Sequence, residues 1–265
     1  MSNIFKLLHD LIIETEITKK CDGVQMLFDN LDKQNYVNGG TENVKKIISA
    51  GLPQKVKLVA PRQVKRRGIQ SQEGRNHLMH SIAHIEFNAI NLALDAAYRF
   101  RNQPTEFYQD WISIACDEAR HFRLIQNYLK QNGCEYGDHP CHNGLWEMAV
   151  KTDHDIVARM ALVPRVLEAR GLDVTPKMIT RLESAGDKAA VNILEIIYQD
   201  EISHVEKGSH WFFYQCQQNN LEPRKTFINM VETHLHGELK GPFNISARLQ
   251  AGFDEDEMAY LNKRY

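Results

Sequence analysis

The sequence has little of several features that would assign it quickly to a class of protein. It contains no apolar run of about 18 residues, so no membrane-spanning helix is expected. Its first residues lack a basic segment followed by an apolar stretch, so we expect no secretory signal. The 5 cysteines are odd in number and irregularly spaced, which disfavours a disulfide framework and favours the reducing cytoplasm. The net charge of −2 gives no general case for nucleic-acid binding.

Strand signals are also scarce, whereas helical periodicity extends over most of the chain. Only Val56–Val59 has the pattern of a short extended stretch. Residues 1–75 carry short helical patterns, residues 76–218 carry four long ones, and residues 219–265 form a tail with a turn at Gly241–Asn244. We therefore expect an all-α protein, in which a four-helix bundle carries extra N-terminal helices and a C-terminal extension packed on the bundle.

Proline and glycine indicate where these helices begin and end. The short N-terminal patterns cover Ile4–Thr18, Val24–Leu31 and Val44–Ile48. Pro104 and Pro176 suit first-turn positions, and Gly133 and Gly171 suit helix ends. The four long helices are predicted at residues 76–101, 104–132, 144–170 and 176–218.

The most informative feature is a pair of similar motifs, DEARH at residues 117–121 and DEISH at residues 200–204. Each places a glutamate and a histidine three residues apart, on one face of a helix. About one such pair is expected by chance, so the motif alone does not establish a site. The neighbouring residues on the same helical face distinguish a buried pair from a solvated one, because a solvated pair would lie on a polar face. The neighbours on both faces are mainly apolar: Trp111, Ile114, Ala115, Phe122, Ile125 and Leu129 in the first, and Leu194, Ile197, Tyr198, Val205, Gly208, Trp211 and Phe212 in the second. Both motifs are therefore predicted to point into the core.

A lone glutamate precedes each motif at nearly the same distance. Glu86 lies 32 residues before Glu118, and Glu168 lies 33 residues before Glu201. Glu86 interrupts a clean apolar stripe, whereas the stripe of Glu168 is poorer and contains Arg165, which offers an ordinary ion pair as the alternative. The two sets are offset by 82 and 83 residues, which indicates an internal repeat of a helix pair.

The repeat has the composition of a two-metal site. Four glutamates and two histidines in this order are the ligands with which four-helix carboxylate bundles bind two iron or manganese ions. Four carboxylates in an apolar bundle repel one another, and two divalent cations would balance their charge. Carboxylate and imidazole ligands suit iron or manganese better than the thiolate-rich sites of structural zinc. The predicted metal ligands are Glu86, Glu118, His121, Glu168, Glu201 and His204, and no catalytic residue beyond them is identified.

Three residues near these ligands have two interpretations each, and a fourth, Pro164, predicts an irregular helix. Asp117 and Asp200 directly precede a ligand glutamate and could accept the second N–H of a ligand histidine, or they could be solvated helix residues. Tyr198 lies one turn before Glu201 and could be a radical or gating residue, or a packed core tyrosine. Pro164 lies one turn before Glu168, so we expect the helix to kink or widen beside the predicted ligands.

Three further groups of polar residues are less specific. His77, His80 and His84 share a face that continues into asparagines and lies opposite Glu86, which favours a polar surface or a helix contact over a metal site. The segment Cys134–His142 contains cysteines and histidines, but its glycines and proline indicate a loop and its spacing fits no standard zinc finger. A basic run is expected to be solvated, with a nucleic-acid or acidic-partner contact as the alternative. The run consists of Lys55, Lys57, Arg62, Lys65, Arg66 and Arg67.

The motifs also resemble those of a known superfamily. The Asp117–His121 motif resembles a form that occurs in the ferritin-like di-iron carboxylate oxygenases and oxidases. The segments His80–Glu86 and Lys240–Asn244 are similar to those of an uncharacterised ferritin-like family of bacterial proteins, and this resemblance covers about residues 55–255. It implies a ferritin-like four-helix fold and a metal site, and it names no substrate.

These observations favour a di-iron oxygenase or oxidase. Such an enzyme uses two iron ions, with manganese as an alternative, activates O2, and takes electrons from an external donor. The substrate would be a small molecule, or a group on tRNA by analogy with a tRNA-modifying hydroxylase on a similar bundle. Ferroxidase or iron storage is the first alternative. Storage subunits consist of little more than the four-helix bundle, whereas this chain has about 75 residues before the bundle and about 50 after it. A metal-stabilised scaffold without catalysis is the second alternative. A homodimer is compatible with each of them.

Overall fold

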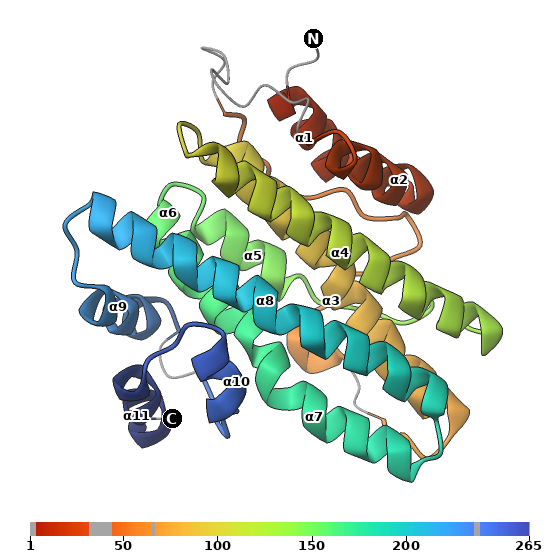
Figure 1. Ribbon diagram of the computed structural model, residues 1–265. Coiled ribbons are helices and arrows are strands. Elements are labelled where there is room, and N and C mark those ends of the chain that lie inside the picture. The colour runs from red at the N-terminus through yellow and green to blue at the C-terminus, as the bar shows by residue number, and fades with distance from the viewer. Residues whose placement is uncertain (1–3, 32–43, 65–66, 236–238, 265) are drawn as a thin grey trace. The chain divides into compact units, whose positions relative to one another are not determined.

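A computed structural model describes residues 4–31, 44–64, 67–235 and 239–264, and most of these residues are helical (Figure 1). Among them, the only strand-like feature is an isolated parallel bridge between Leu58 and Cys141. The all-α class is therefore confirmed for the described part of the chain. The α-helices are α1 (Ile4–Ile13), α2 (Ile17–Phe28), α3 (Gln72–Arg99), α4 (Thr105–Gln131), α5 (Gly144–Lys151), α6 (Ile156–Leu162), α7 (Ala169–Ser184), α8 (Lys188–Gln218), α9 (Pro223–Leu235), α10 (Ile245–Gln250) and α11 (Glu255–Arg264). A 3-10 turn, η2 (Pro61–Gln63), and a π-helical segment, η3 (Val163–Glu168), complete the set.

The chain divides into two compact units. The first comprises residues 1–150 and 185–193, and the second comprises residues 151–184 and 194–265. Helix α8 therefore begins in the first unit and continues in the second. The three-part division expected from the sequence stays a prediction.

The first unit is built on the helix pair α3 and α4. These helices pack against each other, α1 packs on α3, and α2 packs on α4. Ser71 caps α3 by accepting a hydrogen bond from the Gly74 amide at 3.1 Å, and Asn102 adopts a left-handed conformation (φ 59°) in the short connection to α4. Phe87 of α3 and Phe122 of α4 are fully buried with ring centroids 5.0 Å apart, so their packing fixes the two helices side by side.

A buried lysine attaches the N-terminal helices to this pair. The Lys20 ammonium donates hydrogen bonds to the carbonyl oxygens of Ile12 (3.2 Å) and Gly51 (3.1 Å) and to the Asn91 side chain of α3. Lys20 is 0% exposed, and these three oxygen atoms satisfy its three N–H donors. The polar side chain of Asn91 thus serves as a docking point for the N-terminal segment.

The N-terminal helices agree in part with the sequence analysis. The first two predicted patterns correspond to α1 and α2, with a break after Ile13. The third prediction, a helix at Val44–Ile48, is wrong, because the described part of this segment has no helical turn. The stretch Val56–Val59 is extended and pairs with the loop after α4: the Val59 amide donates to the Cys141 carbonyl at 2.8 Å.

The second unit differs most from the predicted helices. The pattern at residues 144–170 is interrupted because Asp155 caps a new helix, α6, by accepting hydrogen bonds from the amides of Val157 (2.8 Å) and Ala158 (3.1 Å). The helix then continues through η3 into α7, so Gly171 is not a helix end. Pro176 also lies inside α7, and not in the first turn of a new helix.

A side chain from the C-terminal segment explains why Pro176 is tolerated inside α7. Proline has no N–H for the carbonyl four residues earlier, which here belongs to Leu172. The Asn244 side-chain amide donates to this carbonyl at 3.1 Å. The same residue caps α10, because its side chain accepts a hydrogen bond from the Ala247 amide. Asn244 thus satisfies the backbone of two helices.

The C-terminal segment packs within the second unit. Helix α9 contacts α6, and α10 contacts α7. As predicted, Gly241–Asn244 separates the helices, and it contains a cis Gly241–Pro242 peptide bond. Arg248 of α10 binds both carboxylate oxygens of Asp173 of α7 at 2.9 and 2.8 Å, and both side chains are buried. The tail is therefore an integral part of this unit.

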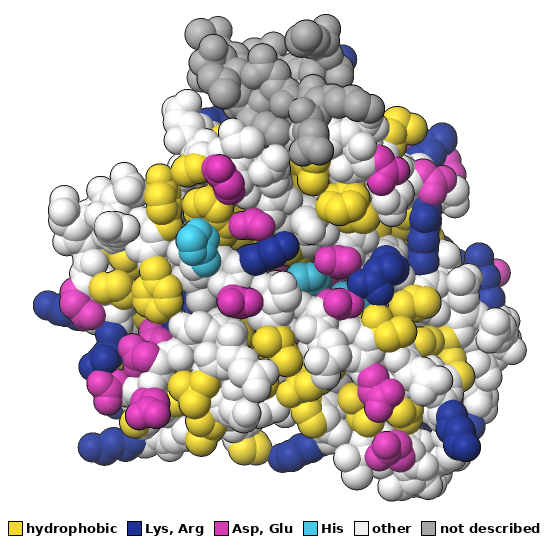
Figure 2. Space-filling view, viewed as in Figure 1, with side chains coloured by type: hydrophobic (Ala, Val, Ile, Leu, Met, Phe, Trp, Pro, Cys, Tyr) yellow, Lys and Arg dark blue, Asp and Glu magenta, His cyan; other side chains and the backbone are white. Residues whose placement is uncertain are grey.

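The described surface carries charges of both signs. Figure 2 shows acidic and basic side chains interspersed with apolar ones on the face in view, as the near-neutral composition suggests. Within the described residues, no helix is both long enough and apolar enough to cross a lipid bilayer.

Candidate metal centre

The first unit brings three of the predicted ligands together. Glu86 extends from α3, and Glu118 and His121 extend from adjacent turns of α4. His121 Nδ1 lies 3.1 Å from Glu86 Oε2 and 3.6 Å from Glu118 Oε2. One ligand atom from each residue lies within 4.8 Å of the other two. The helix packing of α3 on α4 thus produces a compact set of one nitrogen and two carboxylate groups.

These three side chains are almost completely removed from solvent. Glu86 is 3% exposed, Glu118 is 1% exposed and His121 is 0% exposed. Burial raises the pKa of Glu86 well above its usual value, and the neighbouring Glu118 carboxylate adds to the shift. Two buried carboxylates beside one imidazole cannot all be accommodated as isolated charges, so this cluster favours a proton or a cation at its centre.

The second unit contains the other three predicted ligands. Glu201 and His204 lie one turn apart on α8 and are 9% and 1% exposed. The apolar residues of their face are buried as predicted, including Val205 and Phe212 at 0% exposure. Glu168 is half-buried at the end of η3, and it is not part of a cluster of three donor atoms among the described residues of this unit.

Contacts between η3 and α8 place Glu168 level with the α8 motif. A Cβ added to Gly208 would lie 2.2 Å from Pro164 Cβ, so the two backbones approach closely there. One residue further along, Arg165 Nε donates to Ser209 Oγ at 3.2 Å. Pro164 and Gly208 lie equally far on either side of the short connection at residues 185–187, so the chain folds back there and the two segments run antiparallel. Moving four residues on from Pro164 to Glu168 therefore corresponds to moving about four residues back from Gly208, which reaches the level of His204 and the second Glu-x-x-His motif.

The alternative explanation of Glu168 as the partner of Arg165 is not supported. Arg165 Nη2 instead binds both carboxylate oxygens of Glu257 of α11, at 3.0 and 2.8 Å. Both side chains are 0% exposed. Four phenylalanine rings surround the guanidinium, which supplies cation–π contacts in place of water. These rings belong to Phe212, Phe213, Phe227 and Phe253.

The expected disturbance of the helix at Pro164 is confirmed. The chain forms a π-helix from Val163 to Glu168, so the wider turn begins directly before the proline and ends at the predicted ligand. A π-helical turn accommodates a missing backbone N–H and often accompanies a functional site. Gly208 leaves room on α8 for the widened turn, because any side chain there would collide with Pro164.

The donor sets of both units fit a divalent metal ion. Carboxylate oxygens and neutral imidazole nitrogens are ligands of iron and manganese, and the buried glutamates supply the negative charge that such ions neutralise. In the first unit, Glu86, Glu118 and His121 form a cluster of donor atoms. In the second unit, Glu168, Glu201 and His204 lie at corresponding positions along two antiparallel segments, η3 and α8. The convergence of all six residues on one centre stays a prediction.

The histidine face of α3 has a role that the sequence analysis missed. His80 and His84 are 0% and 5% exposed, so of the two expectations the polar surface is wrong, and the contact that buries these residues is made by a loop instead of a helix. They hold the loop after α4: His80 Nε2 accepts a hydrogen bond from the Gly137 amide at 2.8 Å, and His84 Nδ1 lies 2.8 Å from the Tyr136 hydroxyl. Burial lowers the pKa of both imidazoles to about 4, so they remain neutral while they accept these bonds.

The cysteines of this loop also contact histidines. The segment Cys134–His142 is a loop, as predicted. Cys134 Sγ lies 3.8 Å from His139 Nε2, and Cys141 Sγ lies 3.8 Å from His80 Nδ1. The first pair lies within the loop and the second joins the loop to α3, which accounts for the clustering of the two residue types.

Part of the basic run between Lys55 and Arg67 forms ion pairs with the loop after α4 and with the start of α3. Lys55 forms ion pairs with Glu135 and Asp138, and Arg67 pairs with Glu73 at the start of α3. Two members of the run, Lys65 and Arg66, lie outside the described residues. The ion pairs of Lys55 and Arg67 favour the solvated, structural interpretation of the run.

Tyr198 and Asp117 have surroundings that bear on their predicted roles. The Tyr198 hydroxyl accepts a hydrogen bond from the Asn244 side chain at 3.0 Å, so it is tied to the C-terminal segment. This contact favours a packed structural tyrosine over a radical or gating residue. Asp117 accepts a hydrogen bond from Arg120 at 3.1 Å and is 37% exposed. The proposed bonds from Asp117 and Asp200 to ligand histidines stay predictions.

Comparisons with known proteins agree with these observations at the level of the family. Residues 13–259 match the family described as "Protein of unknown function (DUF455)". The chain belongs to this family. A curated "Uncharacterized protein" of Haemophilus influenzae is 45% identical over 253 residues, which cover 92% of this chain and 88% of the relative. No solved structure matches the chain.

Proposed function

We propose that this member of the DUF455 family is a di-iron carboxylate oxygenase or oxidase with a ferritin-like four-helix bundle. One observation carries the proposal: a buried Glu86–Glu118–His121 cluster whose residue types and spacing recur in the second unit. The recurrence includes the lone glutamate, which lies level with the Glu-x-x-His motif of α8. Manganese is an alternative metal, because it prefers similar ligands.

In this proposal the protein supplies ligand geometry and a dry environment. A bound pair of iron ions would supply the site at which O2 is reduced, and O2 would be the oxidant for the substrate. Glu86, Glu118 and His121 would hold one metal position, and Glu168, Glu201 and His204 the other. The cluster is dry because Glu86, Glu118 and His121 are themselves at most 3% exposed, within a helix pair whose Phe87 and Phe122 rings are fully buried.

The protonation of the first cluster follows from its geometry. The Glu86 carboxyl and the His121 ring share a hydrogen bond at 3.1 Å, and burial raises the pKa of Glu86, which favours a proton between them. Metal binding would release this proton, because a ligand carboxylate must be ionised and a ligand imidazole must be neutral. Proton release on metal binding is therefore expected.

The electron donor and the substrate are proposed only as classes. An external donor would reduce the metals, and the substrate would be a small organic molecule or a group carried on tRNA. A homodimer is compatible with this activity.

Metal analysis combined with an oxygen assay tests the proposal. Purified wild-type protein should contain about two iron ions per chain, and the chemically reduced form should consume O2. Glu118→Ala should lose metal and O2 consumption. Glu195→Gln, which changes an exposed glutamate of α8, should retain both.

Other outcomes would support the competing functions. A cage of many subunits that accumulates iron would favour storage. Bound metal that does not react with O2 after reduction would favour a scaffold. Absence of metal from protein purified from cells and after reconstitution would reject the metal centre altogether.

A further inference from the structure

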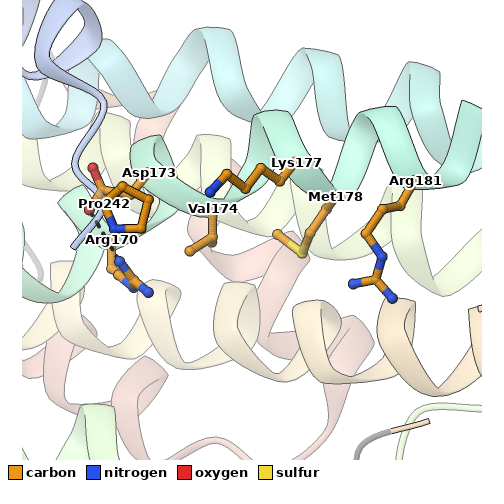
Figure 3. A pocket seen from close by; sticks show the side chains of 7 residues that line it. All are labelled: Arg170, Asp173, Val174, Lys177, Met178, Arg181 and Pro242. Carbon is orange, nitrogen blue, oxygen red and sulfur yellow. Dashed lines mark ion pairs between the residues drawn. The ribbon is translucent and has the colours of Figure 1, made fainter. Parts of the chain in front are cut away.

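A small cavity of about 210 Å³ lies against α7 in the second unit, on a face that the proposed metal site does not use. Figure 3 shows its side chains along α7, with Pro242 beside Arg170 and Asp173 at one end and Arg181 at the other. Glu168 lies two residues before Arg170, which corresponds to about 200° of helical rotation. The cavity is therefore separate from the face that carries the predicted ligand.

The lining of this cavity is strongly cationic. Arg170, Lys177 and Arg181 contribute three positive charges. Asp173 is the one acidic residue in the lining, and both of its oxygens are bound by Arg248, which neutralises its charge. The cavity thus presents an excess of positive charge that no lining residue compensates.

Two of the three cations are available to a ligand. Arg170 donates to the Lys240 carbonyl at 2.8 Å and lies 3.6 Å from Asp173, so it is held in place. Lys177 and Arg181 are exposed and form no ion pair or side-chain hydrogen bond with the residues that the structure describes. They are four residues apart on a helix and therefore lie on the same side, about one turn from each other.

The remaining lining is apolar and firmly positioned. Val174, Met178 and Pro242 form the uncharged part of the cavity. The backbone N–H of Asn244 donates to the Asp173 carboxylate at 2.8 Å, and this bond fixes the Pro242 segment against α7. A ligand that fits would have an anionic group for the cations and a short apolar part for the other wall.

We propose that this cavity binds a small organophosphate, with its phosphate between Lys177 and Arg181 and its apolar part against Met178 and Pro242. Lysine and arginine are the usual partners of phosphate oxygens. The volume is below that of pockets for drug-sized ligands, so the organic part is short. No aromatic residue lines the cavity, and without a ring on which a base could stack, a small molecule is favoured over single-stranded nucleic acid.

Calorimetric titration of the full-length protein at fixed ionic strength tests this site, with n-butyl phosphate and inorganic phosphate as probes. Wild-type protein should bind both, and n-butyl phosphate more tightly. The double variant Lys177→Ala/Arg181→Ala should weaken both by about tenfold or more, because charge-assisted hydrogen bonds to phosphate are lost. Met178→Ser should weaken n-butyl phosphate alone, because it leaves the cations in place.

A charge-matched control makes the result specific. Lys225→Ala/Lys263→Ala removes two exposed lysines of the same unit and should leave both affinities unchanged. Equal losses in the two double variants would overturn the proposal, because the binding would then reflect net charge. Binding of an oligonucleotide but not of n-butyl phosphate would overturn it in favour of a nucleic-acid surface. None of these results depends on the metal content of the proposed centre.

Discussion

Gly208 of α8 lies so close to Pro164 of η3 that a Cβ on the glycine would be 2.2 Å from the proline Cβ. The contact joins the widened helical turn to the helix that carries the second Glu-x-x-His motif. It sets the register that brings Glu168 level with His204, so small changes at either residue should be detectable in both stability and metal binding.

Gly208→Ala should destabilise the protein. The added methyl group cannot be accommodated beside the ring of Pro164, and overpacking of this kind typically costs about 1–3 kcal/mol. Urea denaturation measures the change in unfolding free energy. Gly171→Ala is the matched control, because it lies inside α7 and nothing lies within 4 Å of its added Cβ. That variant should be neutral or stabilised by up to about 1 kcal/mol, and equal losses in the two variants would contradict the close approach.

Pro164→Ala should separate stability from function. Alanine restores a backbone N–H and favours a regular α-helix, so the thermal unfolding temperature should stay the same or rise. A regular turn would shift Glu168 relative to α8, so metal content and the rate of O2 consumption should change. A variant with wild-type metal content and oxidation rate would show that the π-helix has no functional role.

Metal binding should stabilise the folded chain. A ligand that binds only the native state raises the unfolding free energy, by about 2.7 kcal/mol at a free concentration 100 times its dissociation constant. Adding Fe(II) without oxygen should therefore raise the thermal unfolding temperature of wild-type protein, and His204→Ala should reduce the increase. His210→Ala, which removes an exposed histidine six residues further along α8, should keep it. An increase that survives His204→Ala would exclude this residue as a ligand.

Lys20 should make the stability of the first unit depend on pH. Burial lowers the pKa of this ammonium to about 7, whereas the unfolded chain retains a pKa near 10.4. Above pH 7 the unfolded state therefore binds more protons than the native state, and stability rises with pH by about 1.4 kcal/mol per unit until the unfolded lysine titrates. The difference between wild type and Lys20→Met in urea denaturation, measured from pH 7 to 8.5, should show this slope. A constant difference would mean that the lysine stays charged in the fold.

Asn244 and Pro176 should be energetically coupled. Asn244→Ala removes the donor to the Leu172 carbonyl and should cost about 1–3 kcal/mol. In a Pro176→Ala background the helix supplies its own N–H to this carbonyl, so the same substitution should cost less. A double-mutant cycle in urea measures the difference. Costs that simply add would show that Asn244 acts through its other contacts, to Tyr198 and α10.

The sequence predicted features that depend on local periodicity and failed where distant residues intervene. The inward direction of Glu86, Glu118 and His204 follows from the apolar neighbours on their helical faces, and all three side chains are buried. Pro176 indicated a helix start on local grounds, but a side chain 68 residues later supplies the missing donor and lets the helix continue. No local pattern encodes such a contact.

The same distinction applies to the polar residues of α3. Their spacing places them on the face opposite Glu86, and because a polar face is normally solvated or in contact with another helix, the sequence favoured those two interpretations. The loop after α4 and the Lys20 ammonium cover this face and satisfy its hydrogen bonds. Only the tertiary structure shows that the polar groups have protein partners in place of water.

The pairing of Arg165 with Glu257 has a consequence for the order in which the protein can mature. The two residues are 92 positions apart, so Arg165 is synthesised well before its partner. Removing one partner of a buried pair typically costs about 3–5 kcal/mol, so η3 should not pack stably around its guanidinium before α11 has been synthesised. We therefore expect the second set of proposed ligands to become competent for metal only once α11 is available to complete the fold.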